Sequence, residues 1–220
     1  MITLHHLNNS RSQRILWLLE ELELQYEIKF YQRNKETMLA PPELKAVHAL
    51  GKSPVITDGG NVIAESGAII EYLINKYGNG KFKPVSGTPE ALKYTYWMHF
   101  AEGSAMPPLL LTLIFNRIDS APVPFFIKPI IKKVTSQVRS GFINPNVKNI
   151  FDFIEGELAK SEWFAGNEFS GADIQMSFPM EAGAVRAGNM GPKSKAFLEK
   201  IHSRPAYQKA LALGGEYKIG

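Results

Sequence analysis

The sequence has 220 residues, 45% of them hydrophobic, which is enough to bury a sizeable core in one large or two small domains. It has no cysteine, which excludes a disulfide framework, a thiolate metal site and a protein thiol nucleophile. The net charge of +4 is spread along the chain, unlike the concentrated charge of a nucleic-acid-binding surface. Without a signal-peptide pattern or an apolar run of about 20 residues, we expect a soluble, cytoplasmic protein.

The chain begins with a strand–helix–strand pattern. Residues 2–7 alternate in part and predict a strand, and residues 8–12 supply polar turn residues. Apolar residues then recur at helical spacing from residue 15 to about residue 24. Residues 26–31 alternate again, and a second strand reached through a helix is expected to pair in parallel with the first.

A hairpin and a helix complete this first unit. Residues 53–64 predict two strands joined by a turn at Gly59-Gly60. Residues 66–77 carry apolar side chains on one face and predict a helix that ends at Gly78. The order β-α-β followed by β-β-α predicts a small sheet with helices on both faces.

The pattern becomes purely helical near residue 89. Pro89 suits a helix start, and a long periodic segment follows over residues 90–118, which Pro107-Pro108 must kink or break. Further helical patterns cover about residues 131–139, 147–159, 174–187 and 194–202, with a last turn or two after Pro205. We therefore predict a domain over residues 1–80, a linker over 81–88 and an all-helical domain over 89–220.

Three motifs in this order carry a family resemblance. They are residues 10–22 (SRSQRILWLLEEL), residues 51–56 (GKSPVI) with 64–69 (AESGAI), and residues 169–174 (FSGADI). Together they resemble the soluble, cytosolic-type glutathione transferases, especially the serine-type members of the bacterial and fungal branch. The resemblance spans essentially the whole chain. It implies a thioredoxin-like α/β N-terminal domain that holds glutathione, followed by an all-α domain that shapes a site for an electrophile.

The resemblance implies that Lys52, Val55, Glu65 and Ser66 bind glutathione. A cis bond at Pro54 would expose the main chain of Val55 to the cysteinyl backbone of glutathione, although a turn proline at a strand start needs no ligand. Ser66, at a helix start, suits the γ-glutamyl carboxylate and Glu65 suits the ammonium, although both residue types also serve as simple caps. Lys52 would reach the glycyl carboxylate, although a lone loop lysine is usually just solvated.

Ser10 is the catalytic candidate that the resemblance implies. A hydroxyl that donates a hydrogen bond to sulfur, near a helix N-terminus, favours the thiolate form of a thiol whose free pKa is about 8.5. Ser10 could instead only cap the first helix, and Asn9 and Ser12 are alternative donors. Arg14 is expected to be structural and to pair with acidic residues across the domain interface.

The family places the electrophile between the Ser10 loop and the first long helix of the second domain. The apolar residues expected to form its wall are Trp97, Phe100, Met106, Leu110 and Ile114. Glu102 and Arg117 are polar exceptions that could orient a substrate or face solvent. The apolar, proline-rich stretch 121–131 could cover the pocket, pack in a dimer interface or touch a membrane surface.

Two further patterns complete the sequence reading. Ser170 and Asp173 form a capping box with Asp in place of the usual Glu or Gln, flanked by Phe169 and Ile174 as a hydrophobic staple. This pattern predicts a structural role in the helical domain. The five histidines have no metal-ligand spacing on a helix, so no metal site is predicted.

The resemblance implies a homodimeric enzyme with glutathione as cosubstrate, which conjugates glutathione to hydrophobic electrophiles in detoxification. The same thiolate could also give a glutathione peroxidase side activity. The alternatives are a noncatalytic member of the fold that binds glutathione or hydrophobic ligands, and a member used for protein interaction. No nucleic-acid partner and no transmembrane segment are expected. The electrophile, the pathway and the class within the family stay open.

Overall fold

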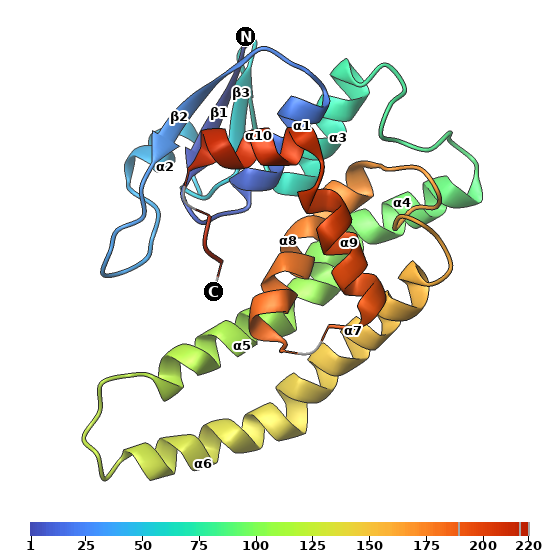
Figure 1. The fold of residues 1–220 in the computed structure, drawn as a ribbon. Helices are drawn as coiled ribbons and strands as arrows, with labels where there is room; N and C mark the ends of the chain where they lie inside the picture. Colours follow the sequence, from blue (N-terminus) through green and yellow to red (C-terminus); the bar gives the residue numbers. More distant parts are fainter. Residues whose placement is uncertain (189, 216, 220) are drawn as a thin grey trace.

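The computed structural model describes residues 1–188, 190–215 and 217–219 and contains one mixed sheet. Its strands are β1 (Ile2–Leu7), β2 (Tyr26–Tyr31), β3 (Val55–Asp58) and β4 (Asn61–Ala64), in the order β2-β1-β3-β4 (Figure 1). β1 and β2 are parallel, while β3 is antiparallel to both β1 and β4. The predicted crossover unit and hairpin are confirmed.

Helices cover both faces of this sheet. α1 (Ser12–Glu21) and α3 (Ser66–Tyr77) pack on the face that carries Leu4, in the main core. Because side chains alternate along a strand, Leu7 points to the other face, where it packs with Leu44 of the short helix α2 (Glu43–Val47). The helix α2 was not predicted.

A carboxylate joins the hairpin to α3. Asp58, at the end of β3, accepts hydrogen bonds from Tyr72 Oη at 2.8 Å, Lys76 Nζ at 2.7 Å and Tyr77 Oη at 2.5 Å. The Asp58 side chain is only 6% exposed, so this ionic contact is partly shielded from water. The contact ties the last turns of α3 to the edge of the sheet.

The rest of the chain is helical. It contains α4 (Pro89–Phe100), the π-helical segment η1 (Ala101–Ala105), α5 (Met106–Asp119), α6 (Lys128–Val138), the π-helical segment η2 (Arg139–Ile143), α7 (Asn144–Leu158), α8 (Gly171–Arg186), α9 (Pro192–His202) and α10 (Pro205–Gly214). In Figure 1, α5 and α6 form an arm that extends away from the sheet. The expected break in the long helix is confirmed, as the π-helical turn η1 directly before Pro107-Pro108.

The centre of the helical part is α8, whose residues 171–183 are all buried. Its N-terminus has the predicted capping box: Ser170 Oγ accepts from Ala172 N, and Asp173 Oδ2 accepts from Ser170 N at 2.9 Å. The other oxygen, Asp173 Oδ1, accepts from Phe164 N at 2.9 Å. Asp173 thus satisfies main-chain donors of two segments, which confirms its predicted structural role.

The last helix, α10, returns to the N-terminal domain and packs along α1 (Figure 1). Ion pairs between Arg204 and Glu21 and between Lys209 and Glu20 hold the two helices together. The change from mixed to purely helical structure falls between the end of α3 and the start of α4. The limits 1–80, 81–88 and 89–220 stay a prediction, and residue 220 lies outside the described residues.

Replacing Asp173 by alanine should destabilise the fold by about 2–5 kcal/mol, because two buried N–H groups would lose their acceptor. Urea unfolding followed by circular dichroism measures this. The matched control is Asp152→Ala on α7, whose side chain is 61% exposed and whose loss should cost less than about 1 kcal/mol. Equal losses for the two variants would contradict the role assigned to Asp173.

The contribution of Asp58 to stability should depend on pH. The hydrogen bond from Lys76, followed by that from Tyr77, holds the pKa of Asp58 at about 2, below its ordinary 3.8. A carboxylic acid whose pKa is lower in the folded than in the unfolded state stabilises the fold at pH values above its unfolded-state pKa. This stabilisation is lost as the pH falls towards the folded-state pKa. The difference in unfolding free energy between wild type and Asp58→Asn should therefore shrink from about pH 4 to pH 2. A difference that is constant over this interval would refute the assignment.

Candidate functional site

A pocket of about 310 Å³ lies where the two parts of the chain meet. The sheet domain contributes residues from the start of α1, from the turn before β3 and from the start of α3, and the helical domain contributes η1 and α5. The residues that line the pocket are Arg11, His48, Leu50, Lys52, Ser53, Pro54, Ala64, Glu65, Ser66, Glu102 and Leu110. The pocket therefore contains three of the four predicted glutathione-binding residues.

At one end of the pocket, an acid and a hydroxyl stand at the start of α3. Ser66 is the first residue of this helix and is 4% exposed, and its hydroxyl has no hydrogen-bond partner among the described residues. The first N–H groups of a helix have no acceptor within it and attract anions. Glu65 is exposed beside it and has φ of 70°, a left-handed conformation that non-glycine residues rarely adopt. The pair fits a group that carries both a carboxylate and an ammonium.

The turn before β3 forms another side of the pocket. The Ser53–Pro54 peptide bond is cis, as the resemblance implied, and Lys52, Ser53 and Pro54 line the pocket. Val55 is buried, and β3 pairs it with His5 of β1 on one side and with Ala64 of β4 on the other. The turn brings the residues directly before Val55 to the pocket wall, and a contact between the Val55 main chain and a ligand stays a prediction.

Ser10 lies beneath the pocket rather than among the residues that line it. It is 4% exposed, and its hydroxyl lies 2.8 Å from Leu7 O, to which it donates, and 2.8 Å from Ser12 Oγ. The same oxygen accepts from Ser12 N at 3.2 Å, a contact typical of a helix start. Ser53 Oγ, at 3.4 Å, connects Ser10 to the pocket.

The other two candidate donors have partners as well. Asn9 Oδ1 accepts from Lys218 N at 2.5 Å, and Ser12 Oγ lies 3.0 Å from His6 Nδ1. His6 Nε2 must donate to Gly214 O, at 3.1 Å, because a carbonyl only accepts. Burial lowers the pKa of His6, so the neutral ring accepts at Nδ1 from the Ser12 hydroxyl. With the Ser12 proton directed to His6, Ser12 Oγ competes with Leu7 O as the acceptor of the single Ser10 proton.

A three-residue ionic cluster borders the pocket and joins the two domains. Arg11 contacts Glu102 through two hydrogen bonds, from Nε at 2.8 Å and from Nη2 at 2.9 Å. Arg14 Nη2 donates to Glu102 Oε1 at 2.6 Å, and its Nη1 donates to Gln175 O at 2.6 Å. Burial alone would raise the pKa of Glu102, but the guanidinium groups of Arg14 and Arg11 lower it. The structural role predicted for Arg14 is confirmed.

The structure separates the five residues predicted to form the electrophile wall. Leu110 lines the pocket and is 50% exposed, and Ile114, one turn further along α5, is also exposed. Trp97 and Met106 are buried. Phe100 is half-buried and packs in an aromatic cluster with Trp97 and Phe153. Of the five, only Leu110 and Ile114 are exposed apolar side chains. A contact of any of the five with an electrophile stays a prediction.

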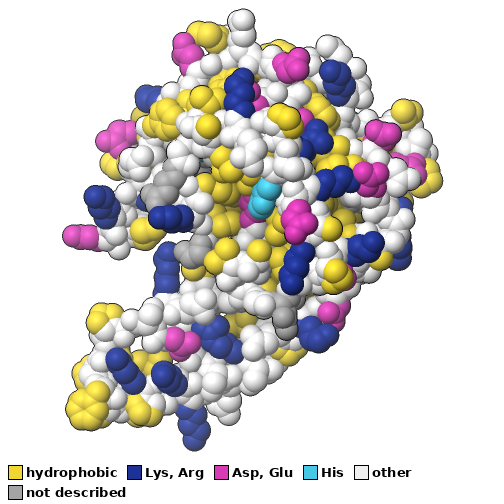
Figure 2. Space-filling view, viewed as in Figure 1, with side chains coloured by type: hydrophobic (Ala, Val, Ile, Leu, Met, Phe, Trp, Pro, Cys, Tyr) yellow, Lys and Arg dark blue, Asp and Glu magenta, His cyan; other side chains and the backbone are white. Residues whose placement is uncertain are grey.

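The proline-rich stretch 121–131 lies at the end of the α5–α6 arm and contributes no residue to this pocket. Phe125 and Phe126 are strongly exposed there. Figure 2 shows hydrophobic side chains at the tip of the arm, with Lys and Arg side chains beside them.

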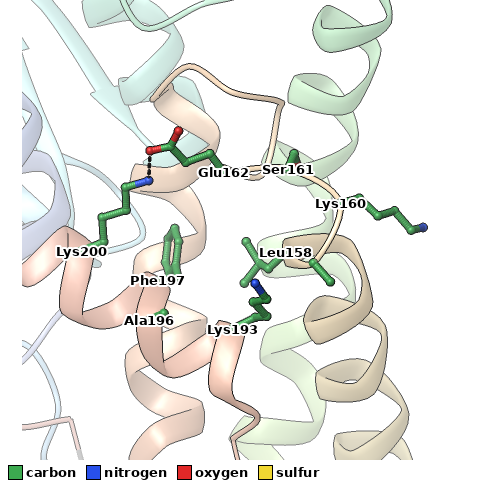
Figure 3. A pocket seen from close by; sticks show the side chains of 9 residues that line it. Leu158, Lys160, Ser161, Glu162, Lys193, Ala196, Phe197 and Lys200 are labelled. Carbon is green, nitrogen blue, oxygen red and sulfur yellow. Dashed lines mark hydrogen bonds and ion pairs between the residues drawn. The ribbon is translucent and has the colours of Figure 1, made fainter.

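A second pocket, of about 380 Å³, lies between the end of α7 and α9 (Figure 3). Lys200 is paired with Glu162 across its rim, and Lys160 points away from the other lining side chains. Among its described lining residues, no buried polar side-chain atom lacks a partner. Two of its three lysines, Lys160 and Lys200, are paired with Glu157 and Glu162, so it is a weaker candidate than the pocket at Ser66.

Residues 1–188, 190–215 and 217–219 contain no cluster of three or more His, Asp or Glu side chains that could hold a metal ion. In the same part of the chain, no helix combines the length and apolar character needed to cross a membrane. Sequence reasoning did not select Arg11, His48, Leu50 and Ser53, which line the pocket. Arg11 follows Ser10 directly, and only the fold shows that its side chain, and not that of Ser10, faces the pocket.

Family models match both halves of the chain. The glutathione S-transferase N-terminal domain matches residues 1–75, and the C-terminal domain matches residues 143–205. Together they span more than half of the 220 residues.

Curated relatives and a solved structure agree with this match. Glutathione S-transferase 3 of Schizosaccharomyces pombe is 39% identical over 94% of this chain and 85% of the relative. Glutathione S-transferase 1 of Saccharomyces cerevisiae is 35% identical over 99% of this chain and 98% of the relative. A glutathione S-transferase crystal structure from Actinobacillus pleuropneumoniae is 35% identical, with a TM-score of 0.81 over 100% of this chain and 95% of that one. The chain belongs to the glutathione S-transferase family.

Proposed function

We propose that the pocket at Ser66 binds glutathione and that the enzyme activates its thiol for attack on hydrophobic electrophiles. The observation that carries this proposal is the buried Ser66 hydroxyl, which has no described partner and stands at the start of α3 beside Glu65. The γ-glutamyl end of glutathione carries a carboxylate for Ser66 and an ammonium for Glu65. Lys52 then binds the glycyl carboxylate from the opposite side.

The cysteinyl part of glutathione is proposed to lie along the turn at cis-Pro54, with its backbone paired to the main chain that leads into Val55. Its sulfur then points towards the Ser10 loop. We propose that Ser10 donates a hydrogen bond to this sulfur. The Ser10 hydroxyl donates to Leu7 O in the structure, and a change of its χ1 rotamer redirects it towards the ligand.

The electrophile is proposed to approach from the α5 side, where Leu110 and Ile114 are exposed. Trp97, Phe100 and Met106 belong to the same proposed wall, and their side chains are buried or half-buried. Hydrophobic electrophiles suit such a surface because their transfer from water onto apolar side chains is favourable. If the protein were a noncatalytic binding or interaction protein, the thiol pKa of bound glutathione would equal that of free glutathione.

We also propose a homodimer in the cytoplasm. Both assignments follow the family, and the dimer is supported by the exposed apolar residues of the α5–α6 arm, among them Ile130 and Val134. The limits of the two domains, residues 1–80 and 89–220, belong to the same proposal.

Glutathione binding should depend on the Ser66 hydroxyl. In Ser66→Ala the carboxylate loses one charge-assisted hydrogen bond, so the dissociation constant should rise about tenfold to a hundredfold. Isothermal titration calorimetry measures it. The control is Ser136→Ala on α6, an exposed serine that donates only to Lys133 O and should leave the affinity unchanged. Equal affinities in wild type and Ser66→Ala would place glutathione elsewhere.

Thiol activation should be visible by ultraviolet absorbance of the thiolate as bound glutathione is titrated with base. Wild type should show a pKa about two units below the free value of about 8.5. Ser10→Ala should bind glutathione and raise the pKa of its thiol by about one unit, which leaves about threefold less thiolate at pH 7 and slows conjugation to a similar extent. If the thiol pKa of glutathione bound to wild type equals that of free glutathione, the alternative of a binding protein is correct.

A further inference from the structure

The residue that brings charge to the pocket is Arg11, the neighbour of Ser10. The Ser10 hydroxyl is turned inward, whereas Arg11 lines the pocket and its side chain is 33% exposed. Two residues of the helical domain, Glu102 and Leu110, line the same pocket, and Arg11 contacts Glu102 directly. Arg11 itself precedes α1 in the sheet domain. Arg11 therefore brings a charged side chain to the pocket from the loop that carries Ser10.

The cluster around Arg11 is not electrically neutral. Two guanidinium groups, those of Arg11 and Arg14, share the single carboxylate of Glu102. Guanidinium groups stay protonated in proteins, and Glu102 is ionised because both arginines lower its pKa. One positive charge thus remains without a counter-charge within the cluster. Arg14 is buried, so the exposed side of this charge is Arg11.

Arg11 also keeps hydrogen-bond donors for a ligand. Its Nε and one Nη2 hydrogen bind Glu102, while its Nη1 group has no acceptor among the described residues. Its guanidinium carbon lies 4.6 Å from the centre of the Phe178 ring on α8. The two-point contact with Glu102 and the ring beneath fix the side chain before any ligand arrives. Because the guanidinium group is already held in place, little free energy is needed to reorient it when negative charge develops beside it.

We propose that Arg11 contacts the sulfur of bound glutathione and stabilises its thiolate, and that Glu102 is the positioning residue that holds Arg11 in place. The step is an ionisation in which the S–H bond breaks, its electron pair stays on sulfur and the proton passes to solvent water. Arg11 stays protonated throughout and acts by its charge and its N–H groups. This inference rests on the proposed function, because it requires glutathione in this pocket.

The test is the thiol pKa of bound glutathione in Arg11→Gln and Arg11→Lys, measured by thiolate absorbance with glutathione at saturation. Arg11→Gln should raise this pKa by about one unit, which is about a tenfold smaller ionisation constant and about threefold less thiolate at pH 7. Arg11→Lys keeps the charge without the planar fork, so its thiol pKa should lie between those of wild type and Arg11→Gln. Unfolding midpoints of both variants establish that the fold is intact.

Lys52→Gln is the matched control, because it removes a positive charge from the same pocket at its other end. It should weaken glutathione binding while leaving the thiol pKa within a few tenths of a unit of wild type. An unchanged thiol pKa in Arg11→Gln, with glutathione bound, would overturn the role of Arg11 and leave the proposed function standing. An equal rise in Lys52→Gln would also overturn it, since the effect would then come from net charge alone. Failure of wild type to bind glutathione would instead refute the proposed function.

Discussion

Arg14 places a permanent positive charge on α1 with only 1% of its side chain exposed, and both of its hydrogen-bond partners lie in the other domain. Breaking a buried ion pair by removing one partner costs about 3–5 kcal/mol. The helical domain must therefore sit where Glu102 Oε1 and Gln175 O can both reach this one guanidinium. Because the pocket lies between the two domains, its shape depends on the same contact.

Glu102 reaches this position because the helix that carries it is not a regular α-helix. Proline rings at positions 107 and 108 have no N–H group and collide with carbonyl groups one turn earlier. The chain responds with the π-helical segment η1, in which Met106 N donates to Ala101 O, five residues back. Such wide turns occur frequently at functional sites. Here the irregular turn carries the acid that joins Arg11 and Arg14.

The features predicted correctly from sequence are those that local chemistry determines. The crossover, the hairpin, the helix over residues 66–77 and the capping box at Ser170 each follow from periodicity or from a cap. The helix α2 was missed because it is short and buries a single side chain, Leu44. Glu65 and Ser66 were correctly predicted to stand at the start of a helix, because the main chain of a helix start determines the direction of the residues there.

Side-chain directions at the other end of the pocket could not be predicted in this way. Ser10 and Arg11 are neighbours, and which of them faces the pocket depends on Ser12, His6 and Glu102. No pattern in the sequence indicates these contacts. The same limit applies to the electrophile wall. Periodicity identified Trp97 as apolar, but the aromatic cluster that buries it includes Phe153 and Phe164, more than 50 residues away.

The loop that carries Ser10 is also fixed by the end of the chain. Gly214 O accepts from His6, and Lys218 N donates to Asn9 Oδ1, so residues about two hundred positions away hold both sides of the loop. Gly214 itself is tightly packed, because a Cβ atom there would lie 2.4 Å from Gln13 Oε1. The direction of the Ser10 hydroxyl therefore depends on α10 being docked against α1.

These constraints separate the two halves of the site. The residues proposed to bind the polar ends of glutathione belong to the sheet domain, with Lys52 in the turn before β3 and with Glu65 and Ser66 at the start of α3. Leu110 and Ile114 lie on the exposed side of α5, outside the core, so substitutions there cost little stability. If the electrophile binds at α5 as proposed, substitutions at these two positions can alter the choice of second substrate while the contact between Arg14 and Glu102 is kept.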